Sequence, residues 1–267
     1  MLVEKIGVKE VKALKRPKEN SHKGDNGKVL IIGGSQHFHG APIFAAKTAS
    51  RIVDLVYFSS VPENNEIIKK MKAKLADFIA VDRTDIFEII KKVDVVLIGP
   101  GLGVSKETAG LTNRILQKFK TKKFVLDADA LKVLDKKLLN RNCVVIPHCK
   151  EFRELFKITP TKQNVIKVAK KYKCVVVLKG QADLLADEKQ FKVNTTGNAG
   201  MTKGGTGDVL AGLIAGLAAK NKLFLAACAG VFINGLAGDR LKQKVSYYYN
   251  ASDLVEEIPR TIFSLII

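Results

Sequence analysis

The sequence contains no tryptophan, and aromatic residues make up only 7% of its 267 residues. A large core must therefore be built mainly from valine, isoleucine, leucine and alanine. Hydrophobic residues account for 46% of the chain and charged residues for 27%, which is ordinary for a globular protein. No linker, low-complexity segment or solenoid-type repeat interrupts the chain, so we expect residues 1–267 to form one domain.

Cysteine is also scarce, with four residues at positions 143, 149, 174 and 228 and no CxxC pair. This pattern favours free, buried thiols in a reducing cytosol. Cys149 follows His148, but neighbours on an extended chain point to opposite sides, which argues against a nucleophile pair. The N-terminal segment has no apolar core typical of a signal peptide, and no apolar stretch reaches the roughly 18 residues of a spanning helix. We therefore expect a soluble, cytoplasmic protein without a membrane partner.

Acidic residues are outnumbered by basic ones, 26 against 45, which gives a formal net charge of +19. Clustered basic residues interleaved with aromatics would indicate nucleic-acid binding. Here the lysines are scattered, so we expect a solvated basic surface and no nucleic-acid partner. The positive field would also favour an anionic small substrate.

Six short runs rich in valine and isoleucine show continuous hydrophobicity instead of polar alternation, at residues 28–34, 54–60, 94–100, 123–129, 143–148 and 174–180. Segments of helical length separate several of them, at 41–53, 63–74, 106–118 and 161–171. This alternation predicts an α/β fold with a mostly parallel central sheet and helices on both faces. Residues 181–196 predict a hairpin, and two helices follow at 209–219 and around 223–241.

Loops rich in glycine or polar residues follow five of the predicted strands, at 33–41, 99–103, 127–131, 147–151 and 179–183. One glycine-rich loop is weak evidence of a phosphate site. Five loops at successive strand ends are stronger, because ligands of open parallel sheets bind beyond the carboxyl ends of the strands.

The strongest signal for chemistry is the segment KGGTGD at 203–208, which leads into an apolar helix. Glycines let the backbone turn at positive φ and bring several N–H groups together. The helix adds unpaired N–H groups and the positive end of its dipole. We interpret the segment as an anion hole that fits a phosphoryl group in transfer.

Asp208 stands between this loop and the helix, and two interpretations are open. It could simply cap a helix beginning at Val209, since aspartate is a favoured N-cap residue. Capping leaves the preceding glycines and the upstream TTGNAG unexplained. We favour a general base that takes a proton from a substrate hydroxyl, and we expect the helix terminus to keep its carboxylate ionised.

Seven ordered motifs resemble the ADP-dependent NAD(P)H-hydrate dehydratases of the ribokinase-like superfamily. They are HKGDNGKVLIIGGS, GAPIFAAKTA, GPGLG, LDADAL, IPHCKEF, LKG and TTGNAGMTKGGTGDVLAGLIAG. The resemblance runs from about Lys9 to Pro259. It implies a ribokinase-like three-layer sandwich, and we expect no room for the epimerase domain that is fused to some relatives.

The resemblance also implies a reaction. Its substrate would be the S-epimer of NADH or NADPH hydrated at C6 of the nicotinamide ring. ADP, or ATP in eukaryotic members, would phosphorylate the ring hydroxyl; phosphate, a far better leaving group than hydroxide, would then depart and restore the double bond. With ADP the by-products would be AMP and phosphate. Mg²⁺ is the implied cofactor, with no metal-ligating residue assigned, and a homotetramer is the implied assembly.

Residue by residue, the resemblance makes Asp208 the catalytic base. It places nucleotide contacts at Lys179, Gly180, Gln181, Ala182, Asp183, Gly205, Thr206 and Gly207. Asp183 replaces the Thr or Ser usual at its position, so its contact stays open. Substrate contacts fall on Ala41, Gly103, His148 and Asp208, although the sequence is equally consistent with a structural imidazole at His148.

Other polar residues remain undecided. Glu151 matches a position that organises magnesium and phosphate in related kinases, but an acid is also favoured in a first helical turn. His37 and His39 either line the substrate pocket or, as we expect, are exposed. Asp127 and Asp129 would suit a metal or a hydrolase as a pair, whereas the resemblance gives them a structural or nucleotide-site role outside the catalytic set.

A kinase of a small hydroxymethyl or hydroxyethyl vitamin precursor is the alternative function. It would use the same Asp208 and anion hole with ATP. The motifs HKGDNG, GPGLG and IPHCKEF fit the dehydratases better.

Overall fold

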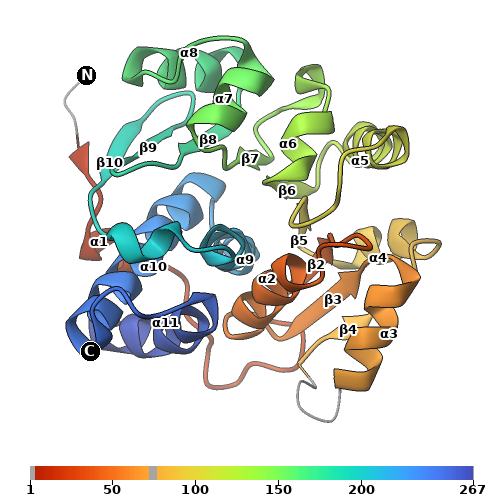
Figure 1. Ribbon diagram of the computed structural model, residues 1–267, viewed down its shortest axis with the longest axis horizontal. Helices are drawn as coiled ribbons and strands as arrows, with labels where there is room; N and C mark the ends of the chain where they lie inside the picture. Colours follow the sequence, from red (N-terminus) through yellow and green to blue (C-terminus); the bar gives the residue numbers. More distant parts are fainter. Residues whose placement is uncertain (1–3, 72–76, 267) are drawn as a thin grey trace.

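A single mixed sheet runs through the computed structural model, which describes residues 4–71 and 77–266 (Figure 1). The strands of these residues are β1 (Glu4–Lys5), β2 (Lys28–Ile32), β3 (Leu55–Ser59), β4 (Ile79–Ala80), β5 (Val95–Ile98), β6 (Lys123–Leu126), β7 (Cys143–Val145), β8 (Val175–Leu178), β9 (Asp183–Ala186) and β10 (Phe191–Asn194). Their order across the sheet is β1-β10-β9-β8-β7-β6-β5-β2-β3-β4. Only β9 runs antiparallel to its neighbours, which confirms the predicted mostly parallel sheet.

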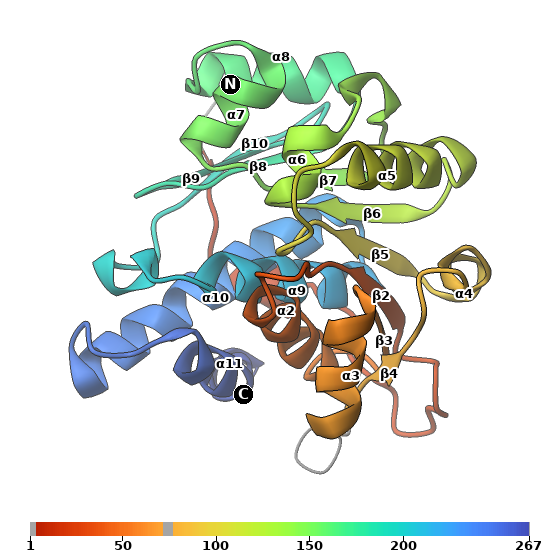
Figure 2. The same cartoon turned by 45° about the vertical axis from the view of Figure 1, so that its right-hand side comes forward.

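Helices cover both faces of this sheet (Figures 1 and 2). They are α1 (Val8–Lys12), α2 (Gly40–Ser50), α3 (Pro62–Met71), α4 (Ile86–Lys92), α5 (Lys106–Lys118), α6 (Asp129–Val133), α7 (Cys149–Phe156), α8 (Lys162–Tyr172), α9 (Thr206–Ala218), α10 (Leu223–Val245) and α11 (Ala251–Ile266), with 3-10 turns η1 (Lys136–Leu138) and η2 (Ala199–Thr202). Side chains of α1, α2, α9, α10 and α11 pack on one face, and those of α4 to α8 on the other. The three predicted layers are therefore present.

Strand β2 shows why the sequence has continuous apolar runs. Val29 and Ile31 point into the core beneath α9 and α10, whereas Leu30 and Ile32 point into the core beneath α4 and α5. All four side chains are fully buried. Because burying one such side chain stabilises the fold by roughly 1.5–3 kcal/mol, a central strand with two covered faces has no position that favours a polar residue.

Most predicted elements are confirmed, with shifted ends. Helix α5 has the predicted bounds, and the hairpin of β9 and β10 closes through a turn in which the Gln190 N–H donates to Asp187. The helix predicted at 63–74 is present as α3 up to Met71, and its remaining residues lie outside the described ranges. The short strands β1 and β4 and the C-terminal helix α11 were not predicted.

Helix α10 differs from the expectation that no apolar stretch is long enough to span a membrane. Among the described helices, it alone is long and apolar enough to cross a membrane by length and composition. However, 72% of its apolar window is buried inside the protein, where it packs against α9 and α11. These contacts are those of a core helix.

Candidate active site

The carboxyl ends of three adjacent strands bring together residues that are far apart in sequence. Asp127 follows β6, His148 follows β7 and Lys179 follows β8. The backbone of His148 and Lys179 continues the parallel pairing as an isolated bridge, with the Lys179 N–H donating to the Pro147 carbonyl at 2.9 Å. The predicted convergence of these loops at one sheet edge is therefore confirmed.

Lys179 and Asp127 form an ion pair at the centre of this edge. The Lys179 ammonium donates to Asp127 Oδ1 at 2.8 Å, and the Asp127 residue is only 1% exposed. Burial opposes the charge of Lys179, but the carboxylates of Asp127, Glu151 and Asp208 outweigh it and raise the pKa of the ammonium. Lys179 thus remains a cation that faces three acids.

Glycine is required where the loop after β5 crosses this pair. Gly99 has φ +131°, and a Cβ there would lie 1.8 Å from the Asp127 carbonyl oxygen. Any side chain at this position would push the β5 and β6 loops apart and displace Asp127. The GPGLG segment therefore serves close packing at the site.

The segment Gly205–Asp208 begins helix α9 beside Lys179. Gly205 is the N-cap, with φ +94°, and makes no side-chain cap. The first helical turn leaves the N–H groups of Gly207 and Asp208 without intrahelical partners. A Cβ on Gly207 would meet only the Lys179 ammonium, at 3.6 Å. The donors and the cation thus face one another across open space, as an anion hole requires.

Two side chains of the same motif support the loop from behind. The Thr206 hydroxyl donates to the Met201 and Lys203 carbonyls, at 2.6 and 2.9 Å. The Lys203 ammonium donates to the Tyr249 carbonyl at 2.6 Å and also to that of Tyr247, so it points away from the hole. Lys179, not Lys203, is therefore the cation beside the α9 terminus.

Asp208 occupies the third position of α9, not its N-cap, which excludes the simple capping interpretation. The expectation that the helix terminus keeps it ionised was wrong. Burial raises the pKa of Asp208 to about 7, and the negative charge of Asp127 adds to the increase although Lys179 opposes it. Near neutral pH this carboxyl can therefore accept or release a proton, as a general base must.

His148 and Glu151 form a capping box at the start of α7. The His148 Nδ1 accepts from the Lys150 and Glu151 N–H groups, and Glu151 Oε2 accepts from the His148 N–H at 2.9 Å. Burial raises the pKa of Glu151. The structural role for His148 is thus present, while half of its side chain stays exposed. Its substrate contact remains a prediction.

Ala41, in the first turn of α2, lies against the loop after β5 that contains Gly103. The Gly103 N–H donates to Asp129 Oδ2 at 2.9 Å, and Lys132 donates to the other oxygen of Asp129. A Cβ on Gly101 would lie 3.3 Å from that of Ala41. Asp129 therefore shapes the loop after β5, which agrees with the structural role given to it, and the substrate contacts of Ala41 and Gly103 remain predictions.

The two histidines of the loop before α2 differ in their exposure to solvent. His37 is exposed, as expected. His39 is partly buried, and its Nδ1 is hydrogen-bonded to Asn64 Oδ1. The expectation of exposure is therefore wrong for His39, because helix α3 packs a polar side chain against the loop.

A cavity of about 510 Å³ extends from the anion hole towards α10. Six of the predicted nucleotide residues line it, namely Lys179, Gly180, Gln181, Asp183, Thr206 and Gly207. Ala182, Gly205, Asp208, Ala41, Gly103 and His148 are not among its lining residues. The two carboxylate oxygens of Asp183 accept from the Gly180 N–H and from Asn194 Nδ2. This side chain therefore holds the 179–183 loop in shape, and its contact with a nucleotide remains a prediction.

Sequence reasoning missed the far wall of the cavity. Val231, Asn234 and Gly235 of α10 line it, and so do residues of the 196–202 loop. Asp239, also on α10, fixes that loop by accepting from the Gly197 N–H and Asn198 Nδ2, at 2.9 and 3.0 Å. The available signal was a pair of polar residues, Asn234 and Asp239, in the otherwise apolar stretch 223–239 of this helix.

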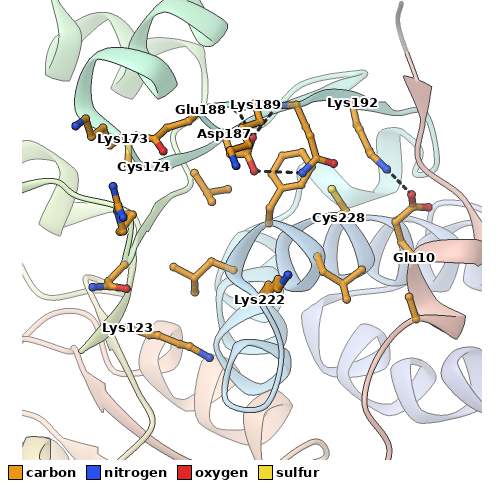
Figure 3. A pocket seen from close by; sticks show the side chains of 18 of the residues that line it. Glu10, Lys123, Lys173, Cys174, Asp187, Glu188, Lys189, Lys192, Lys222 and Cys228 are labelled. Atoms are coloured by element: carbon orange, nitrogen blue, oxygen red, sulfur yellow. Dashed lines mark hydrogen bonds and ion pairs between the residues drawn. The ribbon is translucent and has the colours of Figure 1, made fainter. Parts of the chain in front are cut away.

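A second and larger cavity, about 660 Å³, lies at the amino ends of the strands. Figure 3 shows its lysines, including Lys123, Lys189 and Lys222, around the start of α10. The acid buried beside it, Glu10, is already paired with Lys192 at 2.9 Å. Size alone favours this cavity, but the carboxylates that could move a proton lie at the other end of the sheet.

Comparison with known proteins points to one family. The profile of the NAD(P)H-hydrate dehydratase family matches residues 29–260. The chain is 44% identical to the bifunctional NAD(P)H-hydrate repair enzyme Nnr of Methanocaldococcus jannaschii, over 96% of this chain and 52% of that protein. It thus spans about half the length of the first curated relatives that it matches. It is also 37% identical to the ADP-dependent (S)-NAD(P)H-hydrate dehydratase of Nitrosopumilus maritimus, over 90% of each chain.

Solved structures show the same fold. A ribokinase-like superfamily protein from Enterococcus faecalis superposes with a TM-score of 0.89 at 24% identity, over 98% of this chain and 96% of the other. An ADP/ATP-dependent NAD(P)H-hydrate dehydratase from Bacillus subtilis, co-crystallised with ATP and Mg²⁺, gives 0.85 at 22% identity over 99% of each chain. These identities show the fold alone, which is the predicted ribokinase-like sandwich. By its sequence match, the chain belongs to the NAD(P)H-hydrate dehydratase family.

Proposed function

We propose that this chain is an ADP-dependent dehydratase that returns the S-epimer of hydrated NADH or NADPH to NAD(P)H, with AMP and phosphate as by-products. One observation carries the proposal. Asp208, whose burial and acidic neighbours raise its pKa to about 7, stands at the α9 terminus beside the Lys179–Asp127 pair. A base poised near neutral pH next to an anion hole suits phosphorylation of a hydroxyl.

The proposed reaction has two steps. In the first, Asp208 takes the proton of the ring hydroxyl, whose oxygen bonds to the terminal phosphorus of ADP as the bond to AMP breaks. The N–H groups of Gly207 and Asp208 and the Lys179 ammonium stabilise the charge on the transferring group. In the second, the ring C–O bond breaks, its electron pair leaves with phosphate, and loss of a proton from the neighbouring carbon restores the double bond.

The carboxylates present fit the Mg²⁺ that this family implies. No group of three or more His, Cys, Asp or Glu side chains capable of holding a metal is found in the described ranges. Mg²⁺ bound to a nucleotide usually takes only one or two carboxylates together with phosphate oxygens and water. Asp127 and Glu151, which both act electrostatically on Lys179, would hold it there. The ion would neutralise phosphate charge.

The test is a repair assay. The purified protein is incubated with hydrated NADH and ADP, ATP or no nucleotide, and the absorbance of restored NADH is followed. We expect ADP-dependent recovery with one AMP formed for each NADH. Phosphate transfer to a hydroxymethyl or hydroxyethyl vitamin precursor, without recovery of NADH, would favour the kinase alternative instead.

Three further features belong to the proposal. We infer one catalytic domain over residues 1–267, since one sheet joins both predicted binding regions. A cytoplasmic location is supported by four cysteines that are all free thiols. A homo-oligomer, a tetramer by resemblance, is supported by exposed apolar side chains, including Tyr248 between α10 and α11 and Phe263 in α11. Light scattering would measure the oligomeric state.

A further inference from the structure

Asn234 is a buried polar residue that the proposed reaction does not use. It lies in the middle of α10, where its neighbours Phe232 and Ile233 are buried and apolar. Only 5% of Asn234 is exposed, and its Oδ1 atom has no hydrogen-bond partner among the described residues. Burying such a group without a partner destabilises a protein, and an apolar residue of similar size would avoid that loss.

The same residue lines the 510 Å³ cavity that begins at the anion hole. Val231, Asn234 and Gly235 share one face of α10, because residues three and four apart are neighbours on a helix. Leu210, one turn into α9 from Gly207, lines the cavity with them. The cavity therefore has a cationic end at Lys179 and, on its α10 wall, one carboxamide among apolar residues. The amide of Asn198, which also lines the cavity, is already hydrogen-bonded to Asp239, Gly200 and Tyr249.

This polarity matches a nucleotide bound with its phosphates at Gly207 and Lys179. The flat base would then lie against Leu210 and Val231, with its edge at Asn234. A carboxamide offers one acceptor and two donors, and asparagine is the side chain that pairs bidentately with the amino group and a ring nitrogen of adenine. We propose that Asn234 recognises the purine base of the nucleotide co-substrate and sets the preference for adenine. This inference rests on the proposed function, which supplies the nucleotide.

Two substitutions test the inference. Asn234→Leu keeps the volume and removes both polar groups. We expect it to leave the melting temperature of the nucleotide-free protein unchanged or higher and to raise the KM for ADP about tenfold, with kcat little changed. A purely structural asparagine would give the opposite pattern, a lower melting temperature with an unchanged KM, and that result would overturn the proposal.

Asn234→Asp keeps an acceptor and removes the donor. At pH 8 the carboxylate would repel the adenine ring nitrogen, whereas the two N–H groups on the guanine edge would donate to it. We expect the preference for ADP over GDP, measured as a ratio of affinities by calorimetry, to fall about 10-fold to 100-fold. An unchanged ratio would contradict base recognition by Asn234.

Failure of the proposed function would look different. In that case the wild-type protein would not restore NADH with any nucleotide, while the calorimetric ratio for ADP and GDP would still respond to Asn234→Asp. If instead the wild-type protein is active and neither substitution changes nucleotide binding, only the base-recognition proposal fails. Thr202→Ala is the matched control, because this exposed residue of η2 lines the same cavity and should not alter the ADP to GDP ratio.

Discussion

Two helices of the same core begin beside cavities at opposite ends of one sheet. Helix α9 begins at Thr206 beside the 510 Å³ cavity at the carboxyl edge, and α10 begins at Leu223 beside the 660 Å³ cavity at the amino edge. Both termini carry a dipole and unpaired N–H groups. Lys179 is the cation beside the α9 terminus, and several lysines lie around the start of α10. Yet only the carboxyl edge has the features of a catalytic site.

The two ends of the sheet differ in the residues that lie beside each helix terminus. At the carboxyl edge, glycines expose the α9 terminus, and the strands on either side of β7 bring Asp127 and Lys179 together, where their charges act on Asp208. At the amino edge, Leu223 and Phe224 occupy the first turn of α10, and Lys123 donates to the Ala218 and Asn221 carbonyls. Positive charge at a helix terminus is therefore insufficient; a proton acceptor with a raised pKa distinguishes the two ends.

Asp208→Asn should have the largest effect, because it removes the proton acceptor and keeps the size of the side chain. We expect turnover to fall about 10²-fold to 10⁴-fold with nucleotide binding retained. Turnover is measured by NADH recovery and binding by calorimetry. Near-normal turnover would mean that Asp208 is not a general base and that it does not explain the difference between the two ends of the sheet.

Lys179→Met should reduce kcat/KM for ADP by about 10²-fold, because it removes the cation beside the anion hole. It also leaves the buried Asp127 unpaired, which costs about 3–5 kcal/mol of stability. The double variant Lys179→Met/Asp127→Asn is the control. It should recover much of the melting temperature but none of the activity, and recovery of both would reduce Lys179 to a structural role.

The raised pKa of Asp208 predicts a pH dependence of activity. Below a pKa of about 7 the base is protonated, so kcat/KM should fall about tenfold per pH unit and level off above it. A flat profile between pH 5.5 and 8 would rule out this carboxyl as the base. Because Lys179 lowers the pKa of Asp208, the fall in kcat/KM should begin at a higher pH in Lys179→Met than in the wild type.

The same shift affects stability. The folded state binds a proton at Asp208 between the unfolded pKa near 4 and the folded pKa of about 7, so wild-type stability falls as pH rises through this window. Asp208→Asn avoids the loss. We expect the variant to be more stable than wild type at pH 8, by about 4 kcal/mol, and about equally stable at pH 4. Denaturant unfolding at both pH values would measure it, and no gain at pH 8 would contradict the raised pKa.

The smallest effect is expected at the amino edge. Lys222→Gln and Lys189→Gln change exposed lysines of the larger cavity. Each should change kcat/KM for ADP by less than about twofold at physiological salt, since charges beyond a Debye length of about 8 Å are screened. A larger loss of activity would show that the two ends of the sheet are coupled.

Much of the fold could be predicted because its signals are local. Valine- and isoleucine-rich runs such as 94–100 indicate strands with two buried faces, and β5 confirms this. The glycines at 204, 205 and 207 indicate an exposed helix terminus whatever lies around them. Short elements such as β1, with only two residues, carry too little pattern to be recognised.

The sequence by itself determined the sheet, the glycine-rich start of α9 and the family, because apolar runs, glycine positions and ordered motifs are properties of contiguous residues. The tertiary structure alone decided the raised pKa of Asp208, the choice of Lys179 over Lys203 as the cation and the position of Asn234 at the far end of the cavity. Each depends on charges and surfaces that come from different strands and helices. Electrostatic and packing energies depend on distance in space, and only the folded chain fixes those distances.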